Sequence, residues 1–156
     1  ISKVQFINYL EPIHGILAVL NSKTIVFTPV INKFDWQPIE FGIERVKAYN
    51  PYRHHFQHNG IEIWAQGLTR SHLYAFKDLE KRGELLSLLK GSGLNDLKDL
   101  LPGLQEEWSQ GRISNFEYLM YLNASASRSF NDFSAYPVFP WLINDFSSTG
   151  YSLILN

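Results

Sequence analysis

The strongest constraint on the fold is the stretch 108–145, in which a capped helix precedes a segment restricted by two prolines. Ser114 comes just before a periodic apolar run, and Glu117 follows three residues later. This is the capping-box spacing, which satisfies two backbone N–H groups at the start of a helix. The pattern predicts a helix over 115–125, and because apolar residues occur around most of it, we expect it to be buried on most sides.

Pro137 and Pro140 restrict the chain after this helix. A residue that precedes a proline is driven away from the α-helical conformation, so we expect an extended segment around them. Polar side chains stand at the junction between helix and extended chain, where buried backbone groups need partners. We interpret these side chains as a structural hydrogen-bond cluster, formed by Arg128, Asn131 and Asp132.

This stretch resembles the opening of the BEACH domain, a module named after the Beige and Chediak-Higashi proteins. The family's pattern is a Trp, an Ile-Ser-Asn-aromatic-Glu-Tyr-Leu run, a Leu-Asn pair, an Arg-Ser pair, an Asn-Asp pair and Tyr-Pro-Val-Phe-Pro-Trp. The matching positions are Trp108, 113–119, Leu122, Asn123, Arg128, Ser129, Asn131, Asp132 and 136–141. Ser127 departs from the pattern, because the family usually has Gly there and Ser makes a positive φ more costly. A complete BEACH domain is several times longer than this stretch.

The first half of the chain alternates apolar and polar residues in short runs, which is typical of strands. Asn21-Ser22-Lys23 predicts a tight hairpin, and Asn59-Gly60 predicts a turn. In the loop 29–38, Trp36 is expected to anchor against the sheet. Several short strands with turns at close intervals favour a small antiparallel barrel or sandwich. The expected strands are 4–10, 16–20, 24–28, 39–48 with its continuation 52–56 after Asn50-Pro51, 61–65 and 73–76.

The apolar period changes from strand-like to helical after these strands. Asp78 is a suitable N-cap for a leucine-rich helix, and Gly91 is a suitable residue just past its end. A short helix over 95–101 is expected to stop before Pro102-Gly103, with a further turn over 105–109. Strands followed by one C-terminal helix form the plan of a pleckstrin-homology (PH) domain. In the BEACH family a PH-like domain commonly precedes the BEACH domain, so the resemblance implies one here.

Pattern and resemblance together predict an α+β chain. Its first part is an antiparallel PH-like β-barrel or sandwich with a C-terminal helix, and its second part is a helical and irregular truncated BEACH segment. We expect a PH-like domain over 1–91, a linker with a short helix over 92–103, and the N-terminal fragment of a BEACH domain over 104–156.

Composition narrows the possible partners and compartments. The formal charge is −1, with 45% hydrophobic and 19% charged residues, which argues against nucleic acid as a partner. The chain has no Cys and therefore no disulfide framework. No apolar run approaches the roughly 20 residues that a membrane-spanning helix needs. We expect a piece of a larger protein that is cytoplasmic or attached peripherally to a membrane.

His54, His55 and His58 are the only clustered residues of metal-binding type. On a strand, His54 and His58 would share a face about 13 Å apart while His55 points the other way, so they cannot close a tetrahedral site alone. We interpret them as surface or turn histidines and expect no metal and no cofactor. Because the sequence has no nucleophile elbow and no Gly-rich phosphate loop, we also expect no enzymatic activity.

Three basic residues are candidates for a phosphoinositide patch: Arg45, Lys47 and Arg53. The usual lipid site of a PH domain uses basic residues around the first hairpin loop, and here that loop, Glu11-Pro12-Ile13, contains an acid. A solvated strand face is the favoured interpretation of the three basic residues. A membrane-recruiting, lipid-binding PH module remains the alternative function.

The resemblance implies a non-enzymatic protein-interaction scaffold within a large protein of membrane or vesicle trafficking or receptor signalling, often with WD repeats after the BEACH domain. The expected partners are other proteins and the remainder of the BEACH domain. Residues expected at these contacts or in the structural cluster are Trp108, Asn115, Phe116, Leu119, Arg128, Asn131, Asp132, Tyr136, Phe139 and Trp141.

Overall fold

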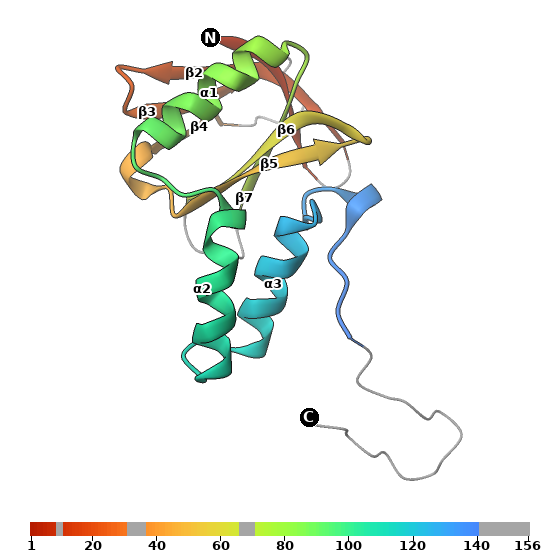
Figure 1. Cartoon of the computed structure of the whole chain (residues 1–156). Coiled ribbons are helices and arrows are strands. Elements are labelled where there is room, and N and C mark those ends of the chain that lie inside the picture. The colour runs from red at the N-terminus through yellow and green to blue at the C-terminus, as the bar shows by residue number, and fades with distance from the viewer. Residues whose placement is uncertain (9–10, 31–36, 66–70, 141–156) are drawn as a thin grey trace, which may run out of the picture.

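The computed structural model describes residues 1–8, 11–30, 37–65 and 71–140 (Figure 1). Seven antiparallel strands form one curled sheet in the order β4-β3-β2-β1-β7-β6-β5. The strands are β1 (Ser2–Ile7), β2 (Ile13–Leu20), β3 (Thr24–Pro29), β4 (Ile39–Gly42), β5 (Ala48–His54), β6 (Gln57–Trp64) and β7 (Ser71–Phe76). The helices are α1 (Leu79–Gly91), α2 (Leu97–Ser109) and α3 (Asn115–Ser125), with short 3-10 turns η1 (Ile43–Arg45) and η2 (Phe133–Ala135).

This arrangement confirms the expected α+β class, and a curled antiparallel sheet followed by a helix is consistent with a PH-like fold. Helix α1 lies across one face of the sheet, whereas α2 and α3 lie side by side and extend away from it (Figure 1). Leu85 and Leu89 of α1 are buried in the main apolar core between the helix and the sheet. No helix in the described part of the chain is both long and apolar enough to cross a membrane.

Several local predictions are confirmed. The β2–β3 hairpin turns at Asn21 and Ser22, which have φ of +49° and +54°. Asp78 caps α1 by accepting hydrogen bonds from the backbone N–H groups of Glu80 and Lys81. Helix α3 spans the expected residues, and Ser114 and Glu117 form both halves of the capping box.

The predicted turn at Asn59-Gly60 is wrong, because β6 runs straight through these residues. The β5–β6 hairpin turns at His55 and Phe56, with φ of +47° and +62°. Gly60 lies very close to Tyr52 of the neighbouring strand β5. A Cβ at position 60 would be only 3.0 Å from the Cβ of Tyr52. The glycine therefore serves close packing between strands instead of a turn.

The predicted strand break at Asn50-Pro51 is also wrong, since β5 includes both residues. Strand β5 is at the edge of the sheet, where a proline without an N–H group costs no ladder hydrogen bond. The real interruption is η1, where the chain passes from one edge strand, β4, to the other, β5. Trp36 and the end of the first expected strand, 9–10, lie outside the described residues.

Helix α2 does not stop before Pro102 as predicted but continues to Ser109. Its apolar residues recur on one face that packs against α3, and this packing outweighs the loss of one backbone hydrogen bond at the proline. Gly91 is the last residue of α1, and Gly93, with φ of +77°, has the left-handed conformation expected after the helix. Helix α3 is not buried on most sides: Phe116 is 48% exposed and Leu122 is 39% exposed.

Replacing two glycines by alanine should change the free energy of unfolding in opposite directions. A Cβ at buried Gly15 of β2 would overlap the ring of Phe27 and lie 2.7 Å from the carbonyl oxygen of Thr28. We expect Gly15→Ala to lower the free energy of unfolding by about 1–3 kcal/mol. Gly83, inside α1, has no atom within 4 Å of such a Cβ, so Gly83→Ala should raise it by roughly 0.5–1 kcal/mol. Urea unfolding of both variants checks the pair, and a destabilised Gly83→Ala together with a neutral Gly15→Ala would contradict it.

Candidate functional site: the buried contact between the sheet and the C-terminal segment

Strands β5, β6 and β7 are buried on both of their faces. One face, with side chains such as Ile61, Ile63 and Tyr74, belongs to the main core. The opposite face of an antiparallel sheet is often left to water. Here it is covered by the start of α2, the end of α3 and residues 126–136, and we call this second covered face the docking face.

The apolar part of the docking face joins the start of β5 to the helices. Ala48, Trp64, Leu97 and Ala124 form one buried cluster, with Leu100 and Tyr121 packed against it. This cluster places the C-terminal end of α3 directly over β5. A second buried apolar cluster on the same face consists of Ile7, Tyr52, Leu73 and Ala75, because Leu73 pairs with Glu62 across β6 and β7. Polar contacts complete the docking face.

Asn50 connects β5 to the end of α3. Its side chain is fully buried, and its Nδ2 donates a 2.6 Å hydrogen bond to the carbonyl oxygen of Ala124. The last carbonyl groups of a helix lack partners within the helix, so this amide acts as a cap supplied by the sheet. Next to it, the backbone N–H of Arg53 donates to Ser127 Oγ at 3.3 Å.

Glu62 lies at the centre of the docking face and is 1% exposed. Its Oε1 accepts hydrogen bonds from Ser71 Oγ at 2.6 Å and from Ser129 Oγ at 2.5 Å. Asn131 Nδ2 donates to Ser71 Oγ at 2.8 Å and to the Ser71 carbonyl oxygen at 3.1 Å. Burial raises the pKa of Glu62 to about 7, although the hydrogen bonds from Ser129, Ser71 and Asn131 oppose the increase. Its second oxygen, Oε2, has no hydrogen-bond partner among the described residues.

Asp132 forms a second polar contact beside Glu62 and is 4% exposed. Its carboxylate accepts hydrogen bonds from Ser134 N–H at 3.0 Å and Ser134 Oγ at 2.6 Å, and from two sheet residues, Tyr52 OH at 3.3 Å and His54 Nδ1 at 3.1 Å. Burial by itself would raise the pKa of Asp132, but the hydrogen bonds from Ser134 and His54 outweigh it and lower the pKa.

Burial lowers the pKa of His54 more than the hydrogen bond to Asp132 raises it. Near neutral pH, His54 is therefore an uncharged imidazole that donates Nδ1–H to a carboxylate, which makes the contact a hydrogen bond between a neutral and a charged group. The interpretation of His54 as a surface or turn histidine is wrong, because the residue is 5% exposed. His55 and His58 are exposed. Within the described ranges, no group of three His, Cys, Asp or Glu residues is arranged to hold a metal ion.

Asn123 attaches the extended segment to α3. Its Nδ2 donates to the carbonyl oxygen of Val138 at 2.9 Å, and its Oδ1 accepts from Val138 N–H at 2.8 Å. The rings of Phe116 and Phe139 stack at 5.8 Å in the same region. The two prolines thus flank a segment that lies along α3.

The sequence-predicted contact residues lie in three places. Asn131 and Asp132 are on the docking face, whereas Arg128 is exposed and donates from Nη1 to the Tyr136 carbonyl oxygen at 3.2 Å. Trp108 Nε1 donates to Asn115 Oδ1 at 2.7 Å, on the outer part of the α2–α3 pair. Phe116, Leu119, Tyr136 and Phe139 line the partly exposed side of α3 and the segment after it, and Trp141 lies outside the described residues.

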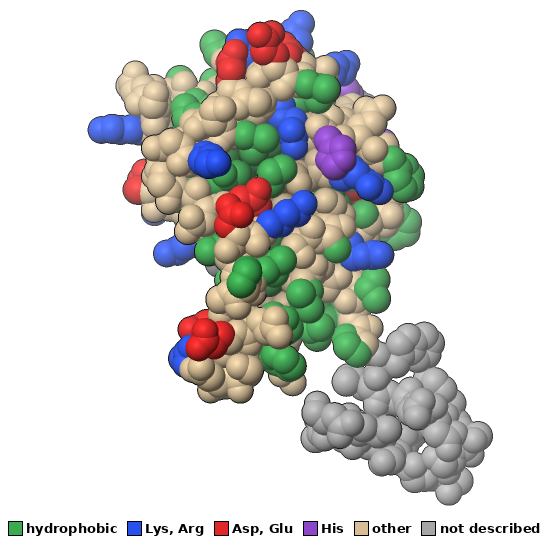
Figure 2. Space-filling view, in the orientation of Figure 1, with side chains coloured by type: hydrophobic (Ala, Val, Ile, Leu, Met, Phe, Trp, Pro, Cys, Tyr) green, Lys and Arg blue, Asp and Glu red, His purple; other side chains and the backbone are tan. Residues whose placement is uncertain are grey.

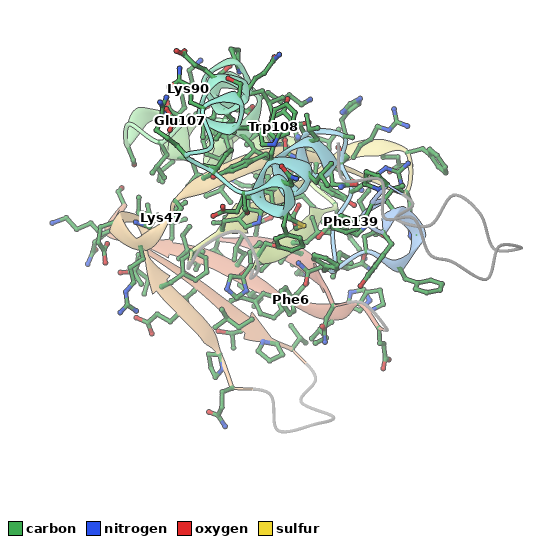
Figure 3. All side chains as sticks on the ribbon, turned by 90° about the horizontal axis from the view of Figure 1, so that it is seen from below. Phe6, Lys47, Lys90, Glu107, Trp108 and Phe139 are labelled. Atoms are coloured by element: carbon green, nitrogen blue, oxygen red, sulfur yellow. The ribbon has the colours of Figure 1, made fainter. Side chains whose placement is uncertain are left out.

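The structure does not bring the three basic lipid candidates together. Arg45 and Lys47 precede β5, whereas Arg53 is at its far end, about 20 Å from Lys47 at roughly 3.3 Å per residue. Figure 3 shows Lys47 at one end of the molecule and Phe139 near the other. Any lipid site would have to use only part of this set.

Most sheet residues of the docking face were missed by sequence reasoning: Asn50, Tyr52, His54, Glu62 and Ser71. Glu62 stands between Ile61 and Ile63, an alternation that normally indicates a strand with one solvent-exposed face. Only the buried Trp64, on the same face two residues later, carried a signal that this face is covered.

Comparison with known proteins supports the resemblance for the C-terminal part of the chain. Residues 106–154 match the family model described as the Beige/BEACH domain. A mouse protein, WD repeat- and FYVE domain-containing protein 4, is 56% identical over 43 residues, which cover 28% of this chain and 1% of that protein. The matched part of the chain therefore spans about a hundredth of the length of this relative. Ser129, Asn131 and Asp132 lie within the matched range, whereas the seven strands lie outside it.

Proposed function

We propose that this chain is a non-enzymatic interaction scaffold, in which a PH-like domain is docked on the first part of a BEACH domain. Proteins with BEACH domains are typically scaffolds of membrane trafficking, and the matched range 106–154 supports that class here. The proposed division is a PH-like domain over 1–91, a connection over 92–103 and a BEACH segment over 104–156. Helix α2 crosses the last boundary and joins the connection to the BEACH segment.

The observation that carries the proposal is the polar docking face. Glu62, Ser71 and His54 on the sheet bond to Ser129, Asn131 and Asp132 on the segment, and these groups are buried or half-buried. Such contacts require exact geometry, since a buried polar group without its partner costs about 1–3 kcal/mol. They favour a rigid platform over a flexible tether. The buried carboxylates are occupied by hydrogen bonds from the chain itself, which favours a structural role for them over acid-base catalysis.

The proposed partners are other proteins and the remainder of a BEACH domain, with no nucleic acid. The exposed aromatic surface of α3 and the segment after it supports this, because large apolar patches mark interfaces. We place the chain within a large cytoplasmic protein, peripherally or indirectly associated with membranes and carrying WD repeats, as the name of the mouse relative indicates for that protein.

The alternative function is recruitment to membranes through phosphoinositides. We expect the full chain to stay in the supernatant when it is sedimented with phosphoinositide-containing liposomes at low salt, where electrostatic screening is weakest. The physical reason is that Arg45 and Lys47 lie apart from Arg53, while the first hairpin loop exposes Glu11. Headgroup-selective pelleting that is lost in the Lys47→Ala variant would identify a lipid-binding module instead.

Proximity labelling in cells with the same full chain tests the scaffold directly. A reproducible set of labelled proteins, reduced in an Asp132→Ala variant with a loosened docking face, supports the proposal. No labelled proteins above background, combined with liposome pelleting, would reject it.

A further inference from the structure

A groove of about 570 Å³ lies where the end of the β5–β6 hairpin meets the end of α3. The hairpin contributes one wall, the last turn of α3 and η2 contribute the other, and Lys98 of α2 also lines the groove. Figure 2 shows Lys, Arg and His side chains along this side of the molecule, beside exposed hydrophobic ones. This groove adjoins the docking face, since Arg53, Ser127, Asp132 and Ser134 contribute to both.

The free charges of the groove are positive. Arg53, Lys98 and Arg128 line it and are exposed. Its one lining acid, Asp132, is 4% exposed, and its carboxylate already accepts hydrogen bonds from Ser134, His54 and Tyr52. A concave surface lined by charges of one sign concentrates the field and attracts the opposite charge. In a chain with a net charge of −1, this cationic groove is a local feature.

The end of α3 also faces the groove, and a helix C-terminus carries partial negative charge. Its last carbonyl groups are occupied, however. The Ala124 oxygen accepts from Asn50 Nδ2 and Ser127 N–H, and the Asn123 oxygen accepts from Arg128 N–H. These donors partly compensate the negative end of the α3 dipole, so it does little to oppose an anionic ligand in the groove.

The backbone turns sharply on both walls of the groove. The described residues include five non-glycine positions with positive φ, and three of them, His55, Phe56 and Ser127, line this groove. At His55 and Phe56 the positive φ belongs to the two-residue turn of the β5–β6 hairpin, and at Ser127 it ends α3, where the N–H of Arg128 bonds to the Asn123 oxygen. These turns hold both walls of the groove in fixed positions beside Arg53 and Arg128.

That geometry presents the ring of Phe56 to solvent. Phe56 is 88% exposed at the hairpin tip, and the guanidinium of Arg53 lies 5.7 Å from its ring centroid. The ring of His55 stacks on buried His54 at 3.9 Å, which anchors the tip to the docking face. Aromatic side chains and arginine are both enriched in protein–protein interfaces relative to the rest of the surface.

We propose that this groove binds an acidic peptide segment of a partner protein, with its carboxylate or phosphate groups between Arg53, Lys98 and Arg128 and an apolar side chain against Phe56. The inference rests on the proposed scaffold function and names the site and chemistry of one partner. A peptide fits better than a bilayer, because the charges line a concave groove and a flat membrane contacts convex surfaces. Aspartate, glutamate and phosphoserine supply the same anionic chemistry.

The test uses the full chain and four fluorescein-labelled twelve-residue peptides that each contain one central phenylalanine. The flanking residues are glutamate, phosphoserine, glutamine or lysine. In fluorescence anisotropy at low salt, we expect the glutamate or phosphoserine peptide to bind at least tenfold more tightly than the glutamine peptide, and the lysine peptide not to bind. The comparison between the two anionic peptides tells which anion is preferred.

Matched variants locate the binding. We expect Arg53→Ala combined with Lys98→Ala to weaken anionic peptide binding at least tenfold, whereas Arg45→Ala combined with Lys47→Ala, which removes the same charge outside the groove, changes it less than twofold. Phe56→Ala should weaken binding three- to tenfold, compared with less than twofold for Phe133→Ala, an exposed phenylalanine that does not line the groove. Unchanged thermal melting of each variant confirms that the fold is intact.

Three results would overturn the proposal. Equal losses in the two charge-removal pairs would show non-specific attraction, and stronger Phe56-dependent binding to vesicles of phosphatidylcholine and phosphatidylserine would identify a membrane site. No binding of either anionic peptide would reject the groove as a peptide site. If neither anionic peptide binds but proximity labelling persists, the scaffold function stands without this groove. If peptide binding and proximity labelling are both absent, the scaffold function is rejected as well.

Discussion

The Asp132→Ala variant is expected to have a free energy of unfolding about 2–5 kcal/mol lower than that of the unaltered chain. The alanine removes the acceptor of Tyr52 OH and His54 Nδ1, which are 0% and 5% exposed residues of the sheet. Each buried donor left without a partner costs about 1–3 kcal/mol. The first turn of η2 also loses the cap that Asp132 provides to Ser134 N–H.

Urea unfolding at pH 7, followed by tryptophan fluorescence and far-ultraviolet circular dichroism, measures this loss. The matched control is Asp99→Ala, which makes the same replacement at an exposed position of α2 and should change stability by only a few tenths of a kcal/mol. If Asp132→Ala is as stable as the control but abolishes partner binding, Asp132 belongs to a recognition site and its proposed structural role is wrong.

The Glu62→Gln variant is expected to remove a pH dependence of stability that the unaltered chain possesses. Burial raises the pKa of Glu62 from 4.5 to about 7 in the folded chain. A carboxyl group with a raised folded pKa contributes fully to stability below its unfolded pKa, and this contribution is lost as the pH rises from about 4.5 to about 7. At about 1.4 kcal/mol per pH unit, the loss amounts to roughly 3 kcal/mol.

Other groups titrate in the same range, so the difference between two chains is the informative quantity. Burial lowers the pKa of both His54 and His72, and their contributions therefore change in the opposite sense, rising with pH up to about 6.5. These contributions are shared by the variant. Asp132, Tyr52, Ser71, Ser129 and Asn131 also surround Glu62 and are unchanged by the replacement.

We expect Glu62→Gln to gain stability relative to the unaltered chain by roughly 3 kcal/mol between pH 4.5 and pH 8. Urea unfolding at half-unit pH steps measures the difference curve. Glu40→Gln, at an exposed position on β4, is the control and should give a flat difference. A flat curve for Glu62→Gln would mean that the carboxyl group is solvated in the folded chain, contrary to the closed docking face.

Local features of the fold could be predicted from the sequence because their causes are local. The capping box of Ser114 and Glu117, the N-cap Asp78 and the hairpin at Asn21 and Ser22 each depend on atoms within three or four residues of each other. A capped apolar run defines a helix wherever it is placed. The alternating pattern similarly indicated an antiparallel sheet.

Features that depend on distant neighbours were predicted wrongly for the same physical reason. Asn59-Gly60 has the residues of a turn, but Gly60 packs closely against Tyr52 on the neighbouring strand, where a larger residue would not fit. The turn is formed by His55 and Phe56 instead. Helix α2 continues through Pro102 because α3 packs along it. In both cases tertiary packing outweighs local preference.

The candidate site also has one part that local sequence determines and one part that distant segments determine. The sequence by itself placed polar residues Asn131 and Asp132 at a helix end where buried backbone groups need partners. Only the tertiary structure decided what those partners are, because His54 is 78 residues from Asp132 and Glu62 is 67 residues from Ser129. Strand alternation by itself does not distinguish a glutamate that faces water from one that faces a second layer of the chain. The free energy that distinguishes them arises from desolvation, and desolvation depends on which segment covers the strand.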